Sequence, residues 1–470
     1  MKGILISSAV TRRLLSTLSI DAAAAVSSTR VLNDLHELRA IGAADPSASS
    51  ARGGDGVAKG VVRPALSAPD VEARLWLMEK AAAAGLEPTI DAIGTTLSRA
   101  PADSRTATRR RLLCGSHSDT QPTGGWLDGA LGVVYALEAA RALRDAGGPA
   151  VIDVVNFQDE EGRFGSLTGS SVYCRGAASI DWEARSLSPE SIAPRETLRE
   201  AAAQHDALAG LPLLELAPCN THGYVGFLEA HIEQGRRLER AGESVAAVSA
   251  IVGLRQFAIT FDGMQNHAGS TSMEDRRDAA LGAFRFAAEL DARFRAHTTT
   301  GSSSSSSSSS VSVWTFGALT LTPGAASIVP GRASLTLQFR DPDEAALDAL
   351  ESIARGAVAE AAAAEGGIAA GLGVNIVHQR PNIDCVPLDD GMRCHVEAAA
   401  EQELPGQWRT FHSGAVHDTG MMQSRMAAAL LFVPSINGIS HDFTEDTHET
   451  DIEAGARVYA AAAARIVSAE

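Results

Sequence analysis

The sequence lacks the features that would place the protein at a membrane or on a nucleic acid. No apolar run approaches the roughly 18 residues that a membrane-spanning helix needs. The formal net charge at pH 7 is −17, whereas nucleic acids and anionic membranes bind basic faces. An anionic small molecule is not excluded, because a few local arginines suffice to bind it. We therefore expect a small-molecule partner and neither nucleic acid nor membrane.

Cysteine is scarce, and several catalytic motifs are missing. The five cysteines include no CxxC pair, so free thiols in a reducing compartment are expected. The chain has no GxSxG nucleophile turn, no Walker A loop and no GxGxxG phosphate turn. It therefore offers no motif for a serine nucleophile or for a bound nucleotide phosphate.

The order of predicted elements indicates two domains, as expected for 470 residues. Strands and helices alternate in residues 29–247 and again in 381–470, which predicts an α/β layered domain with its chemistry at the strand ends. Residues 248–380 contain two helices and a small sheet, which predicts an inserted α+β domain. Inside this insert, Ser302–Ser310 is a low-complexity tract that we expect to be a disordered loop.

Residues 1–28 are predicted to be an N-terminal extension. The first 20 residues contain Lys2, Arg12 and Arg13, many Ser and Leu, and no acid, a composition weakly like that of a mitochondrial transit peptide. A ragged extension explains the same composition. We expect a cytoplasmic protein, with mitochondrial import as the alternative.

Two predicted strands end in residues that bind metals. The apolar run before His117 is followed by Asp128 in a Gly-rich turn, and an imidazole and a carboxylate are standard ligands for Zn²⁺ and similar ions. Asp119 is placed to fix the tautomer of His117 through its carboxylate. The second run, Val151–Phe157, leads into an acidic segment that includes Glu160 and Glu161. The alternatives are a structural hydrogen-bonding histidine and a solvated acidic turn.

Crowded acids repel one another unless a cation neutralises them. Adjacent residues of an extended segment point to opposite sides, so one of these two glutamates can bind metal while the other acts as a general base. His231 and His441 add two further candidates, for which a solvated helix face and a turn-closing role are the alternatives. The complete candidate ligand set is His117, Asp128, Glu161, His231 and His441. Such a set can hold two metals about 3.5–4 Å apart that activate water.

Six motifs in sequence, spread over about residues 30 to 465, resemble the hydantoinase/carbamoylase family of aminoacylase-like dinuclear metallohydrolases. They read GSHSDT, LDGALGV, DEEGRF, HIEQG, NHAGST and SGAVHD. The family contains N-carbamoyl-L-amino-acid hydrolases, β-ureidopropionase, allantoate amidohydrolase and ureidoglycolate amidohydrolase. The resemblance implies a mixed-sheet α/β catalytic domain with an inserted α+β lid, and a homodimer formed through that lid.

The resemblance also implies a role for each candidate ligand. His117 and His231 would bind one metal, His441 and Glu161 would bind the other, and Asp128 would bridge them. The metals would be Zn²⁺ or Mn²⁺, with Co²⁺ or Ni²⁺ as alternatives.

Further catalytic and substrate-binding residues follow from the same motifs. Glu160 would be the general base, His417 would hold the substrate or its developing oxyanion, and His267 would polarise the scissile carbonyl from the partner subunit's lid. Arg340 would bind the substrate's carboxylate, as a guanidinium fork does well. The substrate would also contact Gln234 and Ser327, where Ser327 stands in place of the family's usual Asn. The alternatives are purely structural roles: His267 would only cap a turn, and Arg340 would only form an ion pair with Asp341 or Asp343.

The sequence thus predicts a hydrolase of C–N bonds other than peptide bonds. We expect it to convert an N-carbamoyl amino acid into the free amino acid, CO₂ and ammonia. The nearest alternative is an allantoate or ureidoglycolate amidohydrolase of purine catabolism. An aminoacylase or dipeptidase, and a catalytically inactive binding protein, are more distant alternatives.

Overall fold

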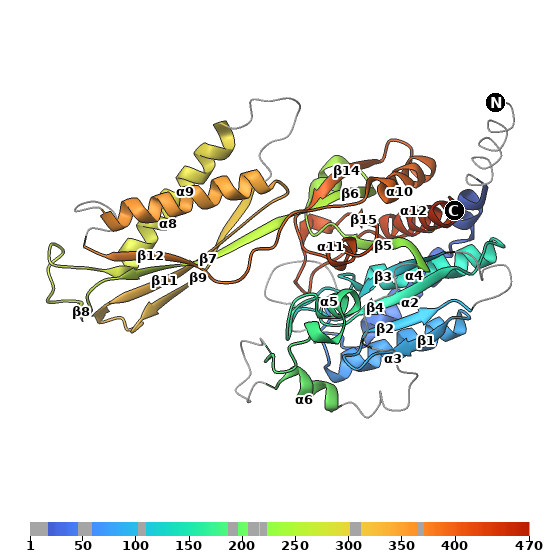
Figure 1. Cartoon of the computed structure of the whole chain (residues 1–470), viewed down its shortest axis with the longest axis horizontal. Coiled ribbons are helices and arrows are strands. Elements are labelled where there is room, and N and C mark those ends of the chain that lie inside the picture. The colour runs from blue at the N-terminus through green and yellow to red at the C-terminus, as the bar shows by residue number, and fades with distance from the viewer. Residues whose placement is uncertain are drawn as a thin grey trace. The chain divides into compact units, whose positions relative to one another are not determined.

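The computed structural model of this chain describes residues 17–45, 59–101, 110–186, 196–204, 216, 223–300, 312–363 and 371–469. The predicted serine-rich loop, Ser302–Ser310, lies outside the described residues. The chain divides into two compact units, which are drawn in Figure 1. The first comprises Met1–Ser249, Leu388–Phe411 and Ala415–Glu470, and the second comprises Ala250–Pro387 and His412–Gly414. The predicted insert, 248–380, stops short of the end of the second unit's main segment.

A mixed sheet forms the centre of the first unit. Its strand order is β1-β2-β4-β3-β5-β15-β6-β13, with β14 paired to β6. The four central strands, β4, β3, β5 and β15, run parallel, whereas β2 and β6 pair with them antiparallel. The strands span Glu87–Ile90 (β1), Thr96–Arg99 (β2), Arg111–His117 (β3), Ile152–Phe157 (β4), Tyr224–Ile232 (β5), Val245–Ile251 (β6), Val386–Pro387 (β13), Trp408–Ser413 (β14) and Ala428–Val433 (β15). This arrangement confirms the predicted α/β fold class.

Helices pack against the mixed sheet and bury its apolar side chains. In the main core α4 and α12 lie against β3 and β5, and the small side chains Ala460–Ala464 of α12 are all buried. The Tyr459 hydroxyl donates to the Leu228 carbonyl at 2.7 Å. The helices span Ser28–Ala40 (α2), Ala68–Ala83 (α3), Ala130–Asp145 (α4), Thr168–Arg175 (α5), Leu198–Ala203 (α6), Arg237–Ala241 (α7), Asp390–Glu403 (α10), Asp418–Gln423 (α11) and Glu449–Ser468 (α12).

The parallel strands bring distant segments to one edge of the sheet, because their carboxyl ends point the same way. β3 ends at His117, and β4 ends three residues before Glu160. His231 is the next-to-last residue of β5. β5 is buried along almost its whole length. The alternative in which His231 lies on a solvated helix face is therefore wrong.

The second unit has its own sheet and its own core. Its four-stranded sheet has the order β12-β7-β11-β9, and the helices α8 and α9 lie over it (Figure 1). Aromatic residues of β7 and β11 are buried in the core that these helices share with the sheet. A separate pair joins β8 to β10. These elements span Gly253–Asp262 (β7), Asn266–His267 (β8), Ala279–Thr300 (α8), Val313–Thr322 (β9), Ile328–Val329 (β10), Arg332–Asp341 (β11), Glu344–Ala363 (α9) and Gly373–His378 (β12).

Helix α8 follows directly after an acidic residue, Asp278. The Asp278 carboxylate accepts hydrogen bonds from the backbone N–H groups of Ala280 and Leu281, at 3.0 and 3.2 Å. An acid that binds free N–H groups in this way caps a helix start, so the helix begins at Ala279.

Part of the predicted N-terminal extension packs on the first unit. Residues 17–25 are helical, and Ala22 and Ala23 are buried in the main core. The Ser19 hydroxyl donates to the Ala461 carbonyl at 3.2 Å. Among the described residues, no helix is both long and apolar enough to cross a membrane.

Two helical glycines predict opposite effects of the same substitution. A Cβ on Gly132 of α4 would lie 2.3 Å from the Ala230 carbonyl oxygen, whereas a Cβ on Gly356 of α9 would meet nothing within 4 Å. Gly132→Ala should destabilise the first unit by about 1–3 kcal/mol through overpacking. Gly356→Ala should stabilise the second unit by about 0.8–1 kcal/mol, because alanine favours helix. Differential scanning calorimetry measures both effects, and equal shifts in Tm would contradict the packing described for α4.

Candidate metal centre

All five predicted metal ligands lie in the first unit, at the carboxyl edge of the parallel strands. Their nitrogen and oxygen atoms form two groups, and within each group the atoms lie within 4.8 Å of one another. The first group is His117, Asp128 and His231, and the second is Asp128, Glu161 and His441. Asp128 is the member that the two groups share.

The two oxygens of the Asp128 carboxylate face different groups. Its Oδ1 lies 3.0 Å from His231 Nε2 and 3.6 Å from His117 Nε2. Its Oδ2 lies 3.3 Å from His441 Nε2. A carboxylate placed in this way can bind one cation through each oxygen.

Backbone carbonyls orient two of the imidazoles. His117 Nδ1 lies 3.0 Å from the Asp119 carbonyl oxygen, and His231 Nδ1 lies 3.0 Å from the Ile232 carbonyl oxygen. Because a carbonyl only accepts, each Nδ1 carries a hydrogen, and in the neutral imidazole each Nε2 then has a lone pair that can bind a metal ion. The prediction that the Asp119 carboxylate fixes the His117 tautomer is wrong, since its Oδ1 is 3.8 Å from Nδ1.

The turn that carries Asp128 fits only a glycine at its next position. Gly129 has φ +63°, and a Cβ there would lie 2.4 Å from atoms of the His117 ring. The buried Glu445 carboxylate accepts from the backbone N–H groups of Leu127 and Asp128, at 3.2 and 3.1 Å. The position of the Asp128 carboxylate is therefore set by the loop that also carries His441.

Glu160 and Gln234 lie beside the ligands. Glu160 is buried, and its Oε2 is 3.7 Å from His117 Nε2. Gln234 Nε2 donates to Asp128 Oδ2 at 3.0 Å, so in this structure its amide contacts a candidate ligand. The Glu161 carboxylate lies 3.6 Å from His441 Nε2 and accepts from Gln121 Nε2 at 2.8 Å.

His417 also belongs to this site. It stands at the N-cap of α11, and its buried ring packs edge-on against the His231 ring, with centroids 4.5 Å apart. Burial and the neighbouring His231 hold the pKa of His417 well below its ordinary value. Its imidazole is therefore neutral at physiological pH and can donate one hydrogen bond.

Comparisons with known proteins agree with this geometry. Residues 113–465 match the family described as Peptidase family M20/M25/M40. An amidase of the hydantoinase/carbamoylase family from Burkholderia phymatum is 37% identical, with a TM-score of 0.77, over 94% of this chain and 98% of its own. The chain is an amidohydrolase of the M20 family, in its hydantoinase/carbamoylase branch.

Relatives of this M20 amidohydrolase include proteins named for different ureido substrates. Allantoate amidohydrolase from Escherichia coli is 30% identical over 86% of this chain and 92% of its own length. An N-carbamoyl-L-amino-acid amidohydrolase from Paenarthrobacter aurescens is 32% identical over 85% of this chain and 91% of its own length. The predicted family is therefore confirmed, whereas these names leave the specific substrate open.

The electrostatics of the M20 site favour a bound cation. Burial and the nearby Asp128 raise the pKa of Glu161 to about 8, and burial and Glu161 raise the pKa of Glu160 well above its ordinary value. Burial alone would lower the pKa of His231, but Asp128 offsets it and raises that pKa to about 9. Crowded carboxylates beside imidazole nitrogens are donors that suit a divalent cation. The residues present therefore fit the metal that the family implies.

Sequence reasoning missed Glu229, which connects three parts of the M20 site. This buried carboxylate accepts from the Ser116 hydroxyl at 2.6 Å and from the Thr419 backbone N–H at 2.8 Å. Ser116 precedes His117, and Thr419 follows His417 by two residues. The available signal was an acid two residues before a histidine in an otherwise apolar strand.

Three predicted site residues lie in the second unit. Ser327 is exposed, and its carbonyl accepts from Ala268 N at 3.0 Å. His267 is also exposed, and its Nδ1 accepts from the backbone N–H groups of Gly269 and Ser270, both at 3.1 Å. His267 thus caps a turn as its alternative proposed, and this bond leaves the hydrogen on Nε2, where it can be donated.

Arg340 has neutral partners in this unit. Its Nε donates to Gln338 Oε1 and its Nη1 donates to the Gly414 carbonyl, both at 3.0 Å. Within the described residues, neither Asp341 nor Asp343 forms an ion pair with it. The alternative that Arg340 only pairs with these acids is therefore wrong.

The pKa shifts predict how the metal-free protein responds to pH. Glu161 and His231 have pKa values of about 8 and 9 in the folded chain, above their ordinary values of roughly 4.3 and 6.5. Between about pH 6.5 and 9 the folded state therefore binds more protons than the unfolded state, and stability should fall as pH rises. Added divalent metal should raise Tm more at the upper end of this range, because protons no longer compete for the ligands. Thermal unfolding with and without chelator measures both trends, and parallel curves would contradict this assignment.

Proposed function

We propose that this M20 amidohydrolase cleaves the C–N bonds of the carbamoyl group of an N-carbamoyl amino acid and releases the amino acid, CO₂ and ammonia. The observation that supports this most is the Asp128 carboxylate, which faces one histidine-containing group through each oxygen, with Glu160 alongside. A pair of cations bridged by one carboxylate is a common means of activating water for hydrolysis.

The proposed cofactor is two divalent metal ions per subunit, Zn²⁺ or Mn²⁺, with Co²⁺ or Ni²⁺ as alternatives. His117 and His231 would hold one ion, Glu161 and His441 the other, and Asp128 would bridge them. When bound, the ions supply a lowered pKa for water and polarise the urea-like carbonyl. Metal analysis of purified protein should give close to two ions per subunit.

Glu160 is the proposed proton carrier. Its carboxylate would accept the proton of the attacking water and deliver it to the departing nitrogen. A raised pKa suits both tasks, since a general base works best when its pKa lies near the working pH. The Nε2–H or Nδ1–H of the neutral His417 would donate to the oxygen that gains negative charge on the attacked carbon.

Residues of the second unit would bind the substrate and complete the site. Arg340 would bind the substrate's carboxylate, and Ser327 would add one hydrogen bond. Gln234 of the first unit would contact the same substrate. His267, with the hydrogen on Nε2, would polarise the scissile carbonyl from the partner subunit of a homodimer.

Allantoate or ureidoglycolate is the second candidate substrate. Relatives named allantoate amidohydrolase or ureidoglycolate hydrolase are 28–30% identical to this chain. Those named for N-carbamoyl-L-amino acids are 30–32% identical, so identity does not separate the two. Both substrates share a ureido group and a carboxylate, so the same residues would serve. Ammonia release from a panel of N-carbamoyl amino acids, allantoate and ureidoglycolate separates the two; release from none would refute the proposed function.

Substituting the proposed base should separate metal binding from turnover. Glu160→Gln keeps the shape of the side chain but removes its proton affinity. We expect kcat to fall by about 10²-fold or more, while metal analysis still finds the wild-type metal content. The control is Glu449→Gln, the same substitution at an exposed glutamate of α12. Wild-type turnover in Glu160→Gln would remove this residue from the mechanism.

A mixing experiment tests whether His267 acts across a dimer. His267→Ala and Glu160→Gln should each be inactive as homodimers. After subunit exchange, a mixed dimer would contain one site with both residues intact and one site with neither. Random pairing of equal amounts makes half of the dimers mixed. About a quarter of wild-type activity should therefore return. Size-exclusion chromatography with light scattering establishes the dimer. No recovery in a verified mixed dimer would show that His267 does not act in trans.

A further inference from the structure

The charge of Arg340 is not neutralised within its own unit. Both of its hydrogen-bond acceptors, the Gln338 side chain and the Gly414 carbonyl, are uncharged. Burial lowers the pKa of Arg340, and the nearby charge of Arg380 lowers it further. Across the described residues, no carboxylate oxygen lies within 4 Å of either guanidinium group. Within the part of the chain that the structure describes, the two guanidinium groups thus repel each other, and neither has an acid as an ion-pair partner.

A chain of side-chain amides connects the two arginines. Gln338 Oε1 accepts from Arg340 Nε, Gln338 Nε2 donates to Gln256 Oε1 at 2.9 Å, and Gln256 Nε2 donates to Gln379 Oε1 at 2.9 Å. The strand register supports this chain, because Gln338 pairs with Gln256 across β11 and β7. Gln379 N also donates to the Gln256 carbonyl at 3.0 Å. The amides therefore fix both the Arg340 fork and the backbone that precedes Arg380.

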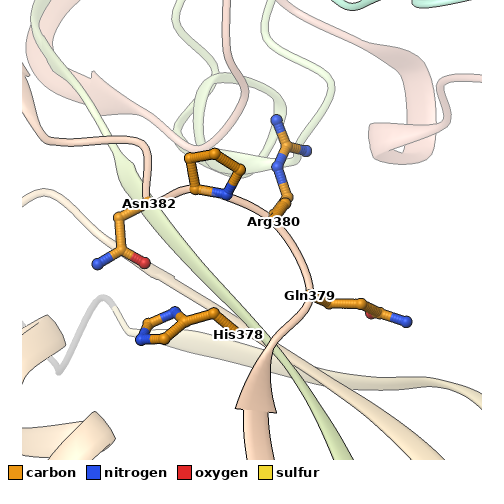
Figure 2. Close-up of a pocket in the computed structure, with 5 residues that line it drawn as sticks. His378, Gln379, Arg380 and Asn382 are labelled. Atoms are coloured by element: carbon orange, nitrogen blue, oxygen red, sulfur yellow. The ribbon is translucent and has the colours of Figure 1, made fainter.

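Arg380 lies in the segment that follows β12. An open pocket of about 460 Å³ is lined by His378, Gln379, Arg380, Pro381 and Asn382. Figure 2 shows the side chains of His378, Gln379, Arg380 and Asn382 pointing in different directions from the segment, with the Arg380 guanidinium directed away from His378. The side chain of Arg380 is exposed, so a ligand can reach it without rearrangement of the core.

We propose that Arg340 and Arg380 form a two-cation site that selects ureido substrates with two carboxylates, of which an N-carbamoyl derivative of an acidic amino acid is the simplest. This inference rests on the proposed function, in which Arg340 binds the α-carboxylate. One carboxylate neutralises one guanidinium, and a second carboxylate on the side chain neutralises the other. A planar guanidinium group can donate two parallel hydrogen bonds to the two oxygens of one carboxylate.

An isosteric pair of substrates tests the proposal. N-carbamoyl-L-aspartate and N-carbamoyl-L-asparagine have nearly the same shape and differ by one negative charge. With the metal-loaded enzyme, kcat/KM should favour the aspartate derivative by about tenfold or more, the effect of one hydrogen bond to a charged group. Arg380→Gln should reduce that ratio to near one. Arg332→Gln should keep the wild-type ratio, since Arg332 is an exposed arginine of β11 that pairs with Asp262 at 3.3 Å.

A binding measurement keeps this test separate from the proposed function. Calorimetry on the Glu160→Gln enzyme gives Kd for both compounds without turnover, and the double variant with Arg380→Gln shows whether the preference for the aspartate derivative disappears. If no ureido compound is hydrolysed but this preference is found and is lost with Arg380, the two-cation site stands and the proposed reaction falls. Equal binding of the two compounds, or a preference that survives Arg380→Gln, overturns the two-cation site.

Discussion

The concentration of negative charge around Asp128 is the constraint on which the rest of the first unit depends. Three carboxylates, from Asp128, Glu160 and Glu161, converge where water is largely excluded. Such a cluster is costly in an empty pocket and favourable around cations. The parallel strands gather these acids, the imidazoles face them, and Glu445 holds the turn on which Asp128 lies. The electrostatic cost of the empty site and its capacity to bind cations thus depend on the same few groups.

The sequence predicted those parts of the fold whose signals are local. β3 and β4 are short apolar runs followed by ligand-type residues, so their place and their shared edge could be inferred. β5 was not predicted as a strand, because Glu229 and His231 interrupt its apolar pattern. Their burial depends on partners from β3 and α11 that are far away in the sequence. Similarly, only the folded backbone shows that a carbonyl, and not the Asp119 carboxylate, orients His117.

The second unit uses its sheet in a different way from the first. One face packs against α8 and α9, and the other face carries polar side chains such as Gln256 and Gln338. Amides on neighbouring strands align one another and thereby hold the Arg340 guanidinium without neutralising it. No periodicity in the sequence distinguishes this arrangement from an ordinary solvated sheet face, because the interacting amides lie on strands that are distant along the chain. The sequence motif could suggest Arg340, but it could not indicate which neighbours orient it.

The bonds from His117 and His231 to main-chain carbonyls also have an evolutionary consequence. The carbonyl oxygens belong to positions 119 and 232, and every amino acid presents the same oxygen there. Genetic drift at these two positions can therefore alter the side chain without re-aiming either imidazole. The orientation of these two imidazoles therefore depends on the course of the backbone and not on which side chain is present at position 119 or 232.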